Sequence, residues 1–88
     1  MKKVLMVGTG DVGQHILEFA ARDGSDIEWV VGDVNEERAR WACNNAEIGA
    51  AHHGKHPKFK PIQVDLFDCE RTTELIQKEK PDAIINCT

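Results

Sequence analysis

Three glycines near the amino terminus have the spacing of a phosphate-binding turn. Gly8, Gly10 and Gly13 form a G-x-G-x-x-G frame within the stretch VLMVGTGDVGQHI at residues 4–16. In such a frame the first glycine permits a tight turn, and the second lets the backbone approach a pyrophosphate. The third allows a helix to pack closely on a strand. The spacing alone is weakly specific, since a glycine-rich turn without a ligand can have the same residues.

The backbone around these glycines offers hydrogen-bond donors to a phosphate. Thr9 lies inside the frame, and Asp11 and Val12 follow at the start of an expected helix. The N–H groups of Asp11 and Val12 would donate to phosphate oxygens, helped by the helix dipole. The Asp11 carboxylate is favoured by the dipole but repelled by a diphosphate. We therefore expect its side chain to point away from the ligand.

An acidic residue follows at the distance that a dinucleotide site requires. Asp33 stands twenty residues after Gly13, at the end of an expected second strand. An acid there accepts hydrogen bonds from the adenosine ribose and repels a 2′-phosphate, so it favours NAD over NADP. Val34 follows, where an NADP site often has a cation, but Arg38 can still reach a 2′-phosphate. The alternative, that Asp33 only leads into the next helix, is weaker because Asn35 suits the helix cap.

Alternating strands and helices must position these residues. Strands are expected at residues 3–7, 27–31, 61–64 and 82–87. The helices are expected at 11–23, after Asn35, and between Asp68 and Pro81, with a loop at 47–60. This βαβαβαβ order predicts a parallel α/β sheet with helices on its faces, which we expect to be Rossmann-like with the usual strand order 3-2-1-4. Residues 1–88 would then form one dinucleotide-binding half-domain, truncated after the fourth strand, with the substrate domain absent.

The spacing of apolar residues predicts which helix faces are buried. In the first helix these are Val12, Ile16, Phe19 and Ala20, with Gly13 and Leu17 at the flank of the face. The second helix has a stripe of small residues at Ala39, Ala42, Cys43 and Ala46. The third presents Thr72, Leu75, Ile76 and Glu79 on one side. Small residues allow the second helix to approach the sheet closely.

Composition excludes several classes of function. The formal net charge of −4 argues against a nucleic-acid partner, which needs a basic face. No apolar run is long enough to span a bilayer, so no membrane association is expected. Cys43, Cys69 and Cys87 are too far apart for a disulfide framework. We interpret them as small apolar fillers in a protein of the reducing cytoplasm.

A histidine-rich stretch is the other group of residues with chemical potential. His52, His53 and His56 stand close together in AHHGKHP. Such tracts can bind zinc or nickel, but no cysteine or acidic cluster completes a tetrahedral set here. We interpret the stretch as a solvated loop and assign no metal ligand. No Ser-His-Asp or Cys-His arrangement stands out, so no catalytic residue is assigned either.

Four stretches together resemble a known family. VLMVGTGDVG, VGDVNEERA, PIQVDLFD and KPDAIINCT are similar to the N-terminal NAD(P)-binding part of saccharopine dehydrogenase-like oxidoreductases. The resemblance covers the whole chain but only the start of such an enzyme. It implies hydride transfer to or from an amino acid or imine, with the substrate site on a domain beyond the fourth strand. The last two stretches also resemble extended short-chain reductases, which usually carry G-x-x-G-x-x-G instead.

The resemblance adds further residues to the expected cofactor site. It places the adenine ring near Asp65, which would accept from the amino group, and near the N–H of Leu66. Helix capping by Asp65 is the alternative. Asn86, Cys87 and Thr88 end the fourth strand and would lie along the pyrophosphate or the nicotinamide-side ribose. The Cys87 side chain itself is expected to fill the core.

The fourth strand raises the question of a partner. In the order 3-2-1-4 its residues AIIN would form an exposed apolar edge, which is prone to self-association. Either the substrate domain of a longer polypeptide or another chain would cover it, and a homo-oligomer is one form of the latter. A regulatory nucleotide-sensing module, like those of channels and transporters, is the alternative function.

Overall fold

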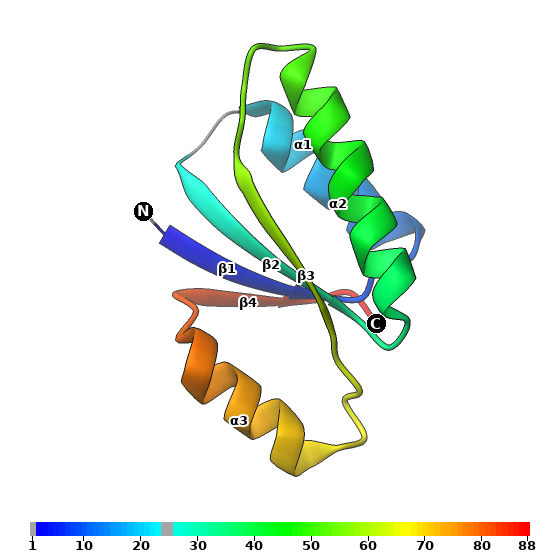
Figure 1. Cartoon of the computed structure of the whole chain (residues 1–88), viewed down its shortest axis with the longest axis vertical. Coiled ribbons are helices and arrows are strands. Elements are labelled where there is room, and N and C mark those ends of the chain that lie inside the picture. The colour runs from blue at the N-terminus through cyan, green and yellow to red at the C-terminus, as the bar shows by residue number, and fades with distance from the viewer. Residues whose placement is uncertain (1, 24–25) are drawn as a thin grey trace.

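The computed structural model describes residues 2–23 and 26–88 and has the expected architecture (Figure 1). The strands are β1 (Lys2–Val7), β2 (Ile27–Asp33), β3 (Lys58–Gln63) and β4 (Ala83–Asn86). The helices are α1 (Asp11–Asp23), α2 (Glu36–Ala51) and α3 (Cys69–Glu79). All strand pairings are parallel, and the strand order is β3-β2-β1-β4. The predicted α/β class and strand order are therefore confirmed.

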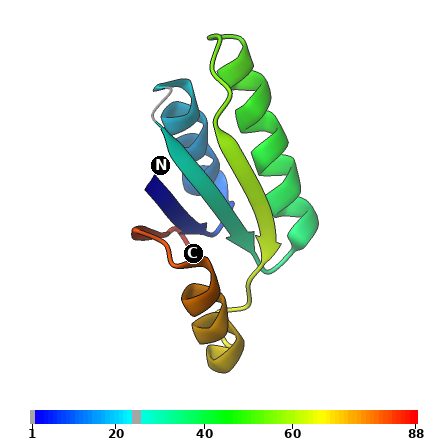
Figure 2. The same cartoon turned by 60° about the vertical axis from the view of Figure 1, so that its left-hand side comes forward.

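Two hydrophobic cores lie on the two faces of the sheet. Figure 1 and Figure 2 show α1 and α2 on one face and α3 on the other. Val4 and Met6 of β1 pack in the core under α1 and α2, whereas Leu5 and Val7 pack in the core under α3. An unbroken apolar run is typical of a strand that is covered on both faces. The run in β1 therefore encodes the three-layer arrangement.

Helix α1 is rotated relative to the face predicted from its sequence. Its buried residues are Gly13, Leu17 and Ala21, which follow one another at intervals of four. Val12 and Phe19, expected in the core, are 67% and 68% exposed. That expectation is wrong because the close contact between Gly13 and the end of β1 sets the rotation of the helix.

Helix α2 is longer than expected, and β3 begins earlier. The Asn35 cap is confirmed, since its Oδ1 accepts hydrogen bonds from the N–H groups of Glu37 and Arg38. The helix continues to Ala51 because Ala50 extends the buried stripe of small residues by one turn. The strand expected at 61–64 covers Lys58–Gln63 instead, so the loop predicted at 47–60 is wrong at both ends.

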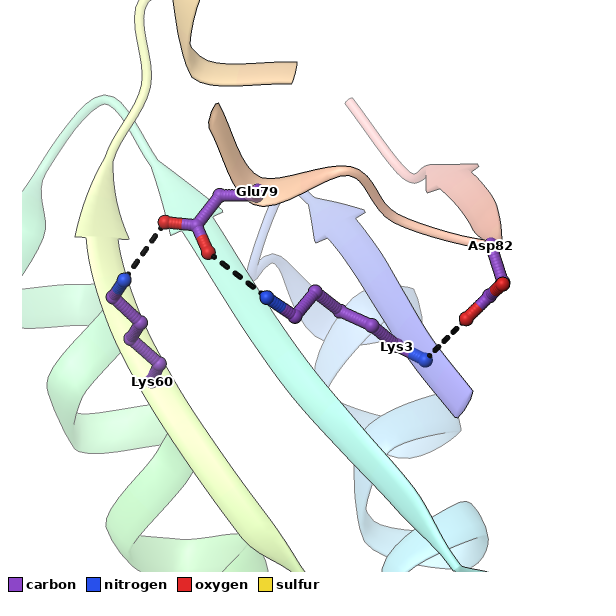
Figure 3. Close-up of polar contacts among 4 residues, drawn as sticks. All are labelled: Lys3, Lys60, Glu79 and Asp82. Atoms are coloured by element: carbon purple, nitrogen blue, oxygen red, sulfur yellow. Dashed lines mark hydrogen bonds and ion pairs between the residues drawn. The ribbon is translucent and has the colours of Figure 1, made fainter. Parts of the chain in front are cut away.

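Helix α3 is attached to the sheet by apolar contacts and by a buried carboxylate. Leu75 and Ile76 pack on the core of that face, as expected. Glu79, only 6% exposed, forms ion pairs with Lys60 at 2.7 Å and Lys3 at 3.4 Å (Figure 3). These contacts connect the end of α3 to strands on both sides of β2.

The cysteines do not share one environment. Cys43 is buried in α2, and burial together with the nearby Glu47 carboxylate raises the pKa of its thiol to about 12. Cys87 is half-buried, but Cys69 is exposed at the start of α3. The expectation that all three fill the core is wrong for Cys69, because it lies on the exposed first turn of α3. Within the described residues, no helix has the length and apolar character needed to cross a membrane.

Candidate functional site

A cavity of about 520 Å³ lies beyond the carboxyl ends of the strands. It is lined by the last residues of β1 and β2, by residues of the segments that follow each of the four strands, and by Arg38 of α2. Those predicted from the sequence are Gly8, Thr9, Gly10, Asp33, Val34, Asp65, Leu66, Cys87 and Thr88. Its volume is in the range of small-molecule and cofactor pockets. The structure therefore brings most of the predicted site residues into one concave surface.

The segment from Gly8 to Gly13, here called the glycine loop, has little room for side chains where it contacts the rest of the fold. Gly8 has a φ of +99°, and a Cβ there would lie 2.8 Å from the carbonyl carbon of Cys87. A Cβ on Gly13 would overlap the carbonyl oxygen of Gly8. These glycines allow α1 and the end of β4 to approach β1 closely.

Gly10 differs from these two glycines because its surroundings are open. A Cβ built on Gly10 would meet no atom within 4 Å among the described residues. Its lack of a side chain is thus unexplained by packing within the chain. A ligand that approaches the backbone at Gly10 would account for the glycine, as the sequence motif predicts.

Asp33 is held in a fixed orientation at the end of β2. Its Oδ2 accepts hydrogen bonds from the Thr9 hydroxyl at 2.6 Å and the Thr9 N–H at 3.0 Å. Its Oδ1 accepts from the Asn35 N–H at 2.9 Å. Burial raises the pKa of Asp33, but these hydrogen bonds and the positive charge of Arg38 outweigh it and leave the pKa below its usual value. Asp33 therefore stays ionised at neutral pH.

The turn between β3 and α3 forms another part of the cavity wall. The Asp65 Oδ1 accepts a hydrogen bond from the Phe67 N–H at 3.0 Å and so stabilises this turn. Asp68 is the residue that caps α3, by accepting from the Arg71 N–H, so the capping alternative for Asp65 is wrong. Leu66 is 39% exposed, and Phe67 is 98% exposed beside it.

The end of β4 closes the cavity near the glycine loop. The Cys87 N–H donates to the Val7 carbonyl at 2.7 Å. The Asn86 Oδ1 accepts from the N–H and the hydroxyl of Thr88, at 3.1 and 2.7 Å. Asn86 does not itself line the cavity, whereas Cys87 and Thr88 do. The amide of Asn86 thus shapes the cavity wall through Thr88.

Some predicted residues lie outside the cavity, and others within it were missed. Asp11 and Val12 are exposed on the first turn of α1, and Gly13 is buried beneath it. Arg38, considered only for a 2′-phosphate, lines the cavity together with Phe67, which was not among the predicted site residues. A signal for Phe67 existed in its place directly after Leu66, because adjacent turn residues share one end of a sheet.

The arrangement suits an elongated ligand with hydroxyl and phosphate groups. The first N–H groups of a helix lack acceptors within the helix, and those of α1 begin beside the glycine loop. The ionised Asp33 carboxylate offers an acceptor for hydroxyl groups at the end of the neighbouring strand β2. Exposed apolar atoms of Val34 and Phe67 can cover a flat ring.

The fold and the position of the cavity define the class of the domain. Parallel strands in the order β3-β2-β1-β4, with helices on both faces, form half of a Rossmann-like α/β domain. Ligands of such sheets bind beyond the carboxyl ends of the strands.

Comparison with protein-family models identifies the family. Residues 4–88 match the model described as Saccharopine dehydrogenase NADP binding domain. The chain therefore belongs to this family of pyridine-nucleotide-binding domains, and the resemblance seen in the sequence is confirmed. A comparison with curated proteins gave no match.

Two solved structures illustrate the fold. Quinate dehydrogenase from Corynebacterium glutamicum, solved in complex with NAD, is 20% identical with a TM-score of 0.68. The match covers 99% of this chain and 27% of that protein. Apo saccharopine dehydrogenase (L-Glu forming) from Saccharomyces cerevisiae is 19% identical with a TM-score of 0.70, over 100% of this chain and 17% of that protein. The chain thus spans less than a third of either protein.

Proposed function

We propose that the chain binds the adenosine and pyrophosphate part of NAD for a cytoplasmic oxidoreductase. The observation that carries the proposal is the ionised Asp33 carboxylate, fixed in a cavity directly beside the glycine loop. In this arrangement the pyrophosphate contacts Gly10 and the N–H groups of Asp11 and Val12. A ribose hydroxyl donates to Asp33.

The adenine ring lies at the other end of the cavity in this proposal. Val34, Leu66 and Phe67 offer apolar contacts to its two faces, and Asp65 accepts from its amino group. Cys87 and Thr88 lie toward the pyrophosphate and the nicotinamide-side ribose. When bound, the nicotinamide supplies or accepts the hydride, and the substrate is an amino acid or an imine held by a further domain.

The preference for NAD follows from charge. A 2′-phosphate would bring a dianion next to the Asp33 carboxylate in a partly buried site, where repulsion between like charges is strong. The family description names NADP, and Arg38 is the cation that would have to compensate. Asp33 is held by hydrogen bonds, whereas Arg38 is exposed, so we expect the repulsion to dominate.

Titration of the chain with NADH and NADPH tests this function. We expect NADH to bind about tenfold or more tightly than NADPH, which corresponds to about 1.4 kcal/mol or more. The Asp33→Asn variant keeps the shape of the side chain and removes its charge, so it should narrow this difference. Tighter binding of NADPH by the unaltered chain would refute the NAD preference, and no binding of either nucleotide would refute the function.

A further inference from the structure

Thr9 is a polar residue whose burial needs an explanation. It is fully buried at the tip of the glycine loop. Both of its donors, the hydroxyl and the backbone N–H, point to Oδ2 of Asp33, at 2.6 and 3.0 Å. The side chain is thus committed to a single acceptor atom.

The Asp33 carboxylate has one hydrogen-bond acceptor position left for a ligand. Each oxygen of an ionised carboxylate can accept about two hydrogen bonds. Thr9 fills both positions on Oδ2, and the Asn35 N–H fills one on Oδ1. One position on Oδ1 is therefore available to a hydroxyl group in the cavity.

We propose that Thr9 is a positioning residue that fixes Asp33 so that its Oδ1 accepts from one ribose hydroxyl, and that this fixation sets the selection of NAD over NADP. The inference rests on the proposed function and adds a determinant of its cofactor specificity. A carboxylate that is free to rotate can turn away from a 2′-phosphate and so relieve the repulsion. A carboxylate held at both oxygens cannot turn away, so the discrimination persists.

The other charged groups around the cavity do not replace this contact. The charged side chains that line it besides Asp33 are Arg38 from α2 and Asp65 from the turn after β3. Arg38 attracts a 2′-phosphate, and Asp65 is engaged with the Phe67 N–H. Removing the Thr9 hydroxyl removes the shortest of the three hydrogen bonds and leaves Oδ2 with the residue-9 N–H as its single donor, so the carboxylate turns more freely. NADH binding should then weaken, while the attraction of Arg38 for NADPH remains.

The test compares Thr9→Ala with Thr9→Ser, because these variants differ only in the hydroxyl. Thr73 gives the matched control, since it is exposed on α3, its hydroxyl donates to the Cys69 carbonyl, and it does not line the cavity. We expect Thr9→Ala to bind NADH about tenfold more weakly than Thr9→Ser. The ratio of NADH affinity to NADPH affinity should fall toward one in Thr9→Ala. Thr73→Ala and Thr73→Ser should not differ in this preference.

A pH profile separates positioning from a general loss of structure. The hydroxyl stabilises the charged form of Asp33, so its removal should raise the pKa of that carboxyl. On acidification, NADH affinity should therefore begin to fall at a higher pH in Thr9→Ala than in Thr9→Ser. The free energy of unfolding is measured for each variant, and Thr9→Val provides a second variant without the hydroxyl. In the unaltered chain, NMR titration should give Asp33 a pKa below its usual value.

Several results would overturn the inference. Equal nucleotide preference in Thr9→Ala and Thr9→Ser, while the unaltered chain binds NADH, would refute the role of Thr9 and leave the proposed function intact. An Asp33 pKa at or above its usual value in the unaltered chain would refute the fixation of the carboxylate. Absence of NADH and NADPH binding by the unaltered chain would refute the proposed function, and the inference with it.

Discussion

The carboxylate of Glu79 at the end of α3 forms an ion pair with the ammonium group of Lys60 in β3, at 2.7 Å (Figure 3). The Glu79 side chain is 5% exposed, whereas that of Lys60 is 48% exposed. The same carboxylate reaches Lys3 in β1 at 3.4 Å. A single buried anion therefore holds α3 against strands on both sides of β2.

Neutralising this anion should destabilise the fold. Glu79→Gln leaves Lys60 and Lys3 without their partner, and we expect a loss of about 1–3 kcal/mol in the free energy of unfolding. Glu74→Gln, on an exposed position of the same helix, should change it by less than about 0.5 kcal/mol. Urea unfolding followed by circular dichroism measures both. Equal stability of the two variants would show that the ion pairs contribute nothing.

The stability of the chain should depend on pH through the same group. The hydrogen bond from Lys60 lowers the pKa of Glu79, burial opposes it, and the charges of Lys60 and Lys3 lower it further, so the net pKa is below its usual value. A group with a lowered folded-state pKa contributes stability above its unfolded-state pKa, and this is lost as the pH falls through the folded-state value. Glu79→Gln should therefore lose less stability on acidification than the unaltered chain. Parallel acid profiles would contradict this.

Two substitutions in the glycine loop should have different effects, one on stability and the other on nucleotide binding. Gly13→Ala places a methyl group against the Gly8 carbonyl, and we expect a loss of about 1–3 kcal/mol in unfolding free energy. The methyl group of Gly10→Ala meets no atom within 4 Å in the described part of the chain, so this variant should leave stability nearly unchanged while weakening NADH binding about tenfold or more. Denaturation and calorimetric titration of both variants test this. Unimpaired NADH binding by Gly10→Ala would contradict a ligand close to that backbone.

The outer edge of β4 should promote self-association. Ile84 is 50% exposed on this short edge strand, and a charge there is expected to oppose pairing with another chain. Ile84→Lys should lower the apparent mass in sedimentation experiments at high concentration. Ile48→Lys, on a position of α2 that is 60% exposed, is the control and should not change the apparent mass. A monomer of unaltered sequence at all concentrations would contradict the expectation.

The sequence was sufficient to predict the fold, but it was less reliable for the orientation of individual elements. Alternating strand and helix patterns indicate a parallel sheet with right-handed crossovers, and the glycine frame followed by Asp33 indicates the Rossmann-like order 3-2-1-4. The rotation of α1 was misassigned because Val12 and Phe19 increase the apolar character of a face that the sheet does not cover. Close packing of Gly13 on the Gly8 carbonyl, directly after β1, decides the rotation, and that contact depends on tertiary structure.

The candidate site was predictable to a similar degree. Asp33 could be selected because its distance from Gly13 is determined by the length of one helix and one strand. Its hydrogen bonds to Thr9 could not, because they depend on the rotamer of a buried threonine at the end of a different strand. The exposed Phe67 was missed for a related reason, since its neighbours across the cavity are distant in sequence.

The most direct test of the account is calorimetric titration of the chain with NAD, ADP-ribose and nicotinamide mononucleotide. The cavity and the glycine loop are assigned to the adenosine and pyrophosphate groups, which ADP-ribose retains and nicotinamide mononucleotide lacks in part. We predict that ADP-ribose binds within about threefold of NAD and that nicotinamide mononucleotide binds at least about a hundredfold more weakly. Tighter binding of nicotinamide mononucleotide than of ADP-ribose, or no binding of ADP-ribose, would contradict it.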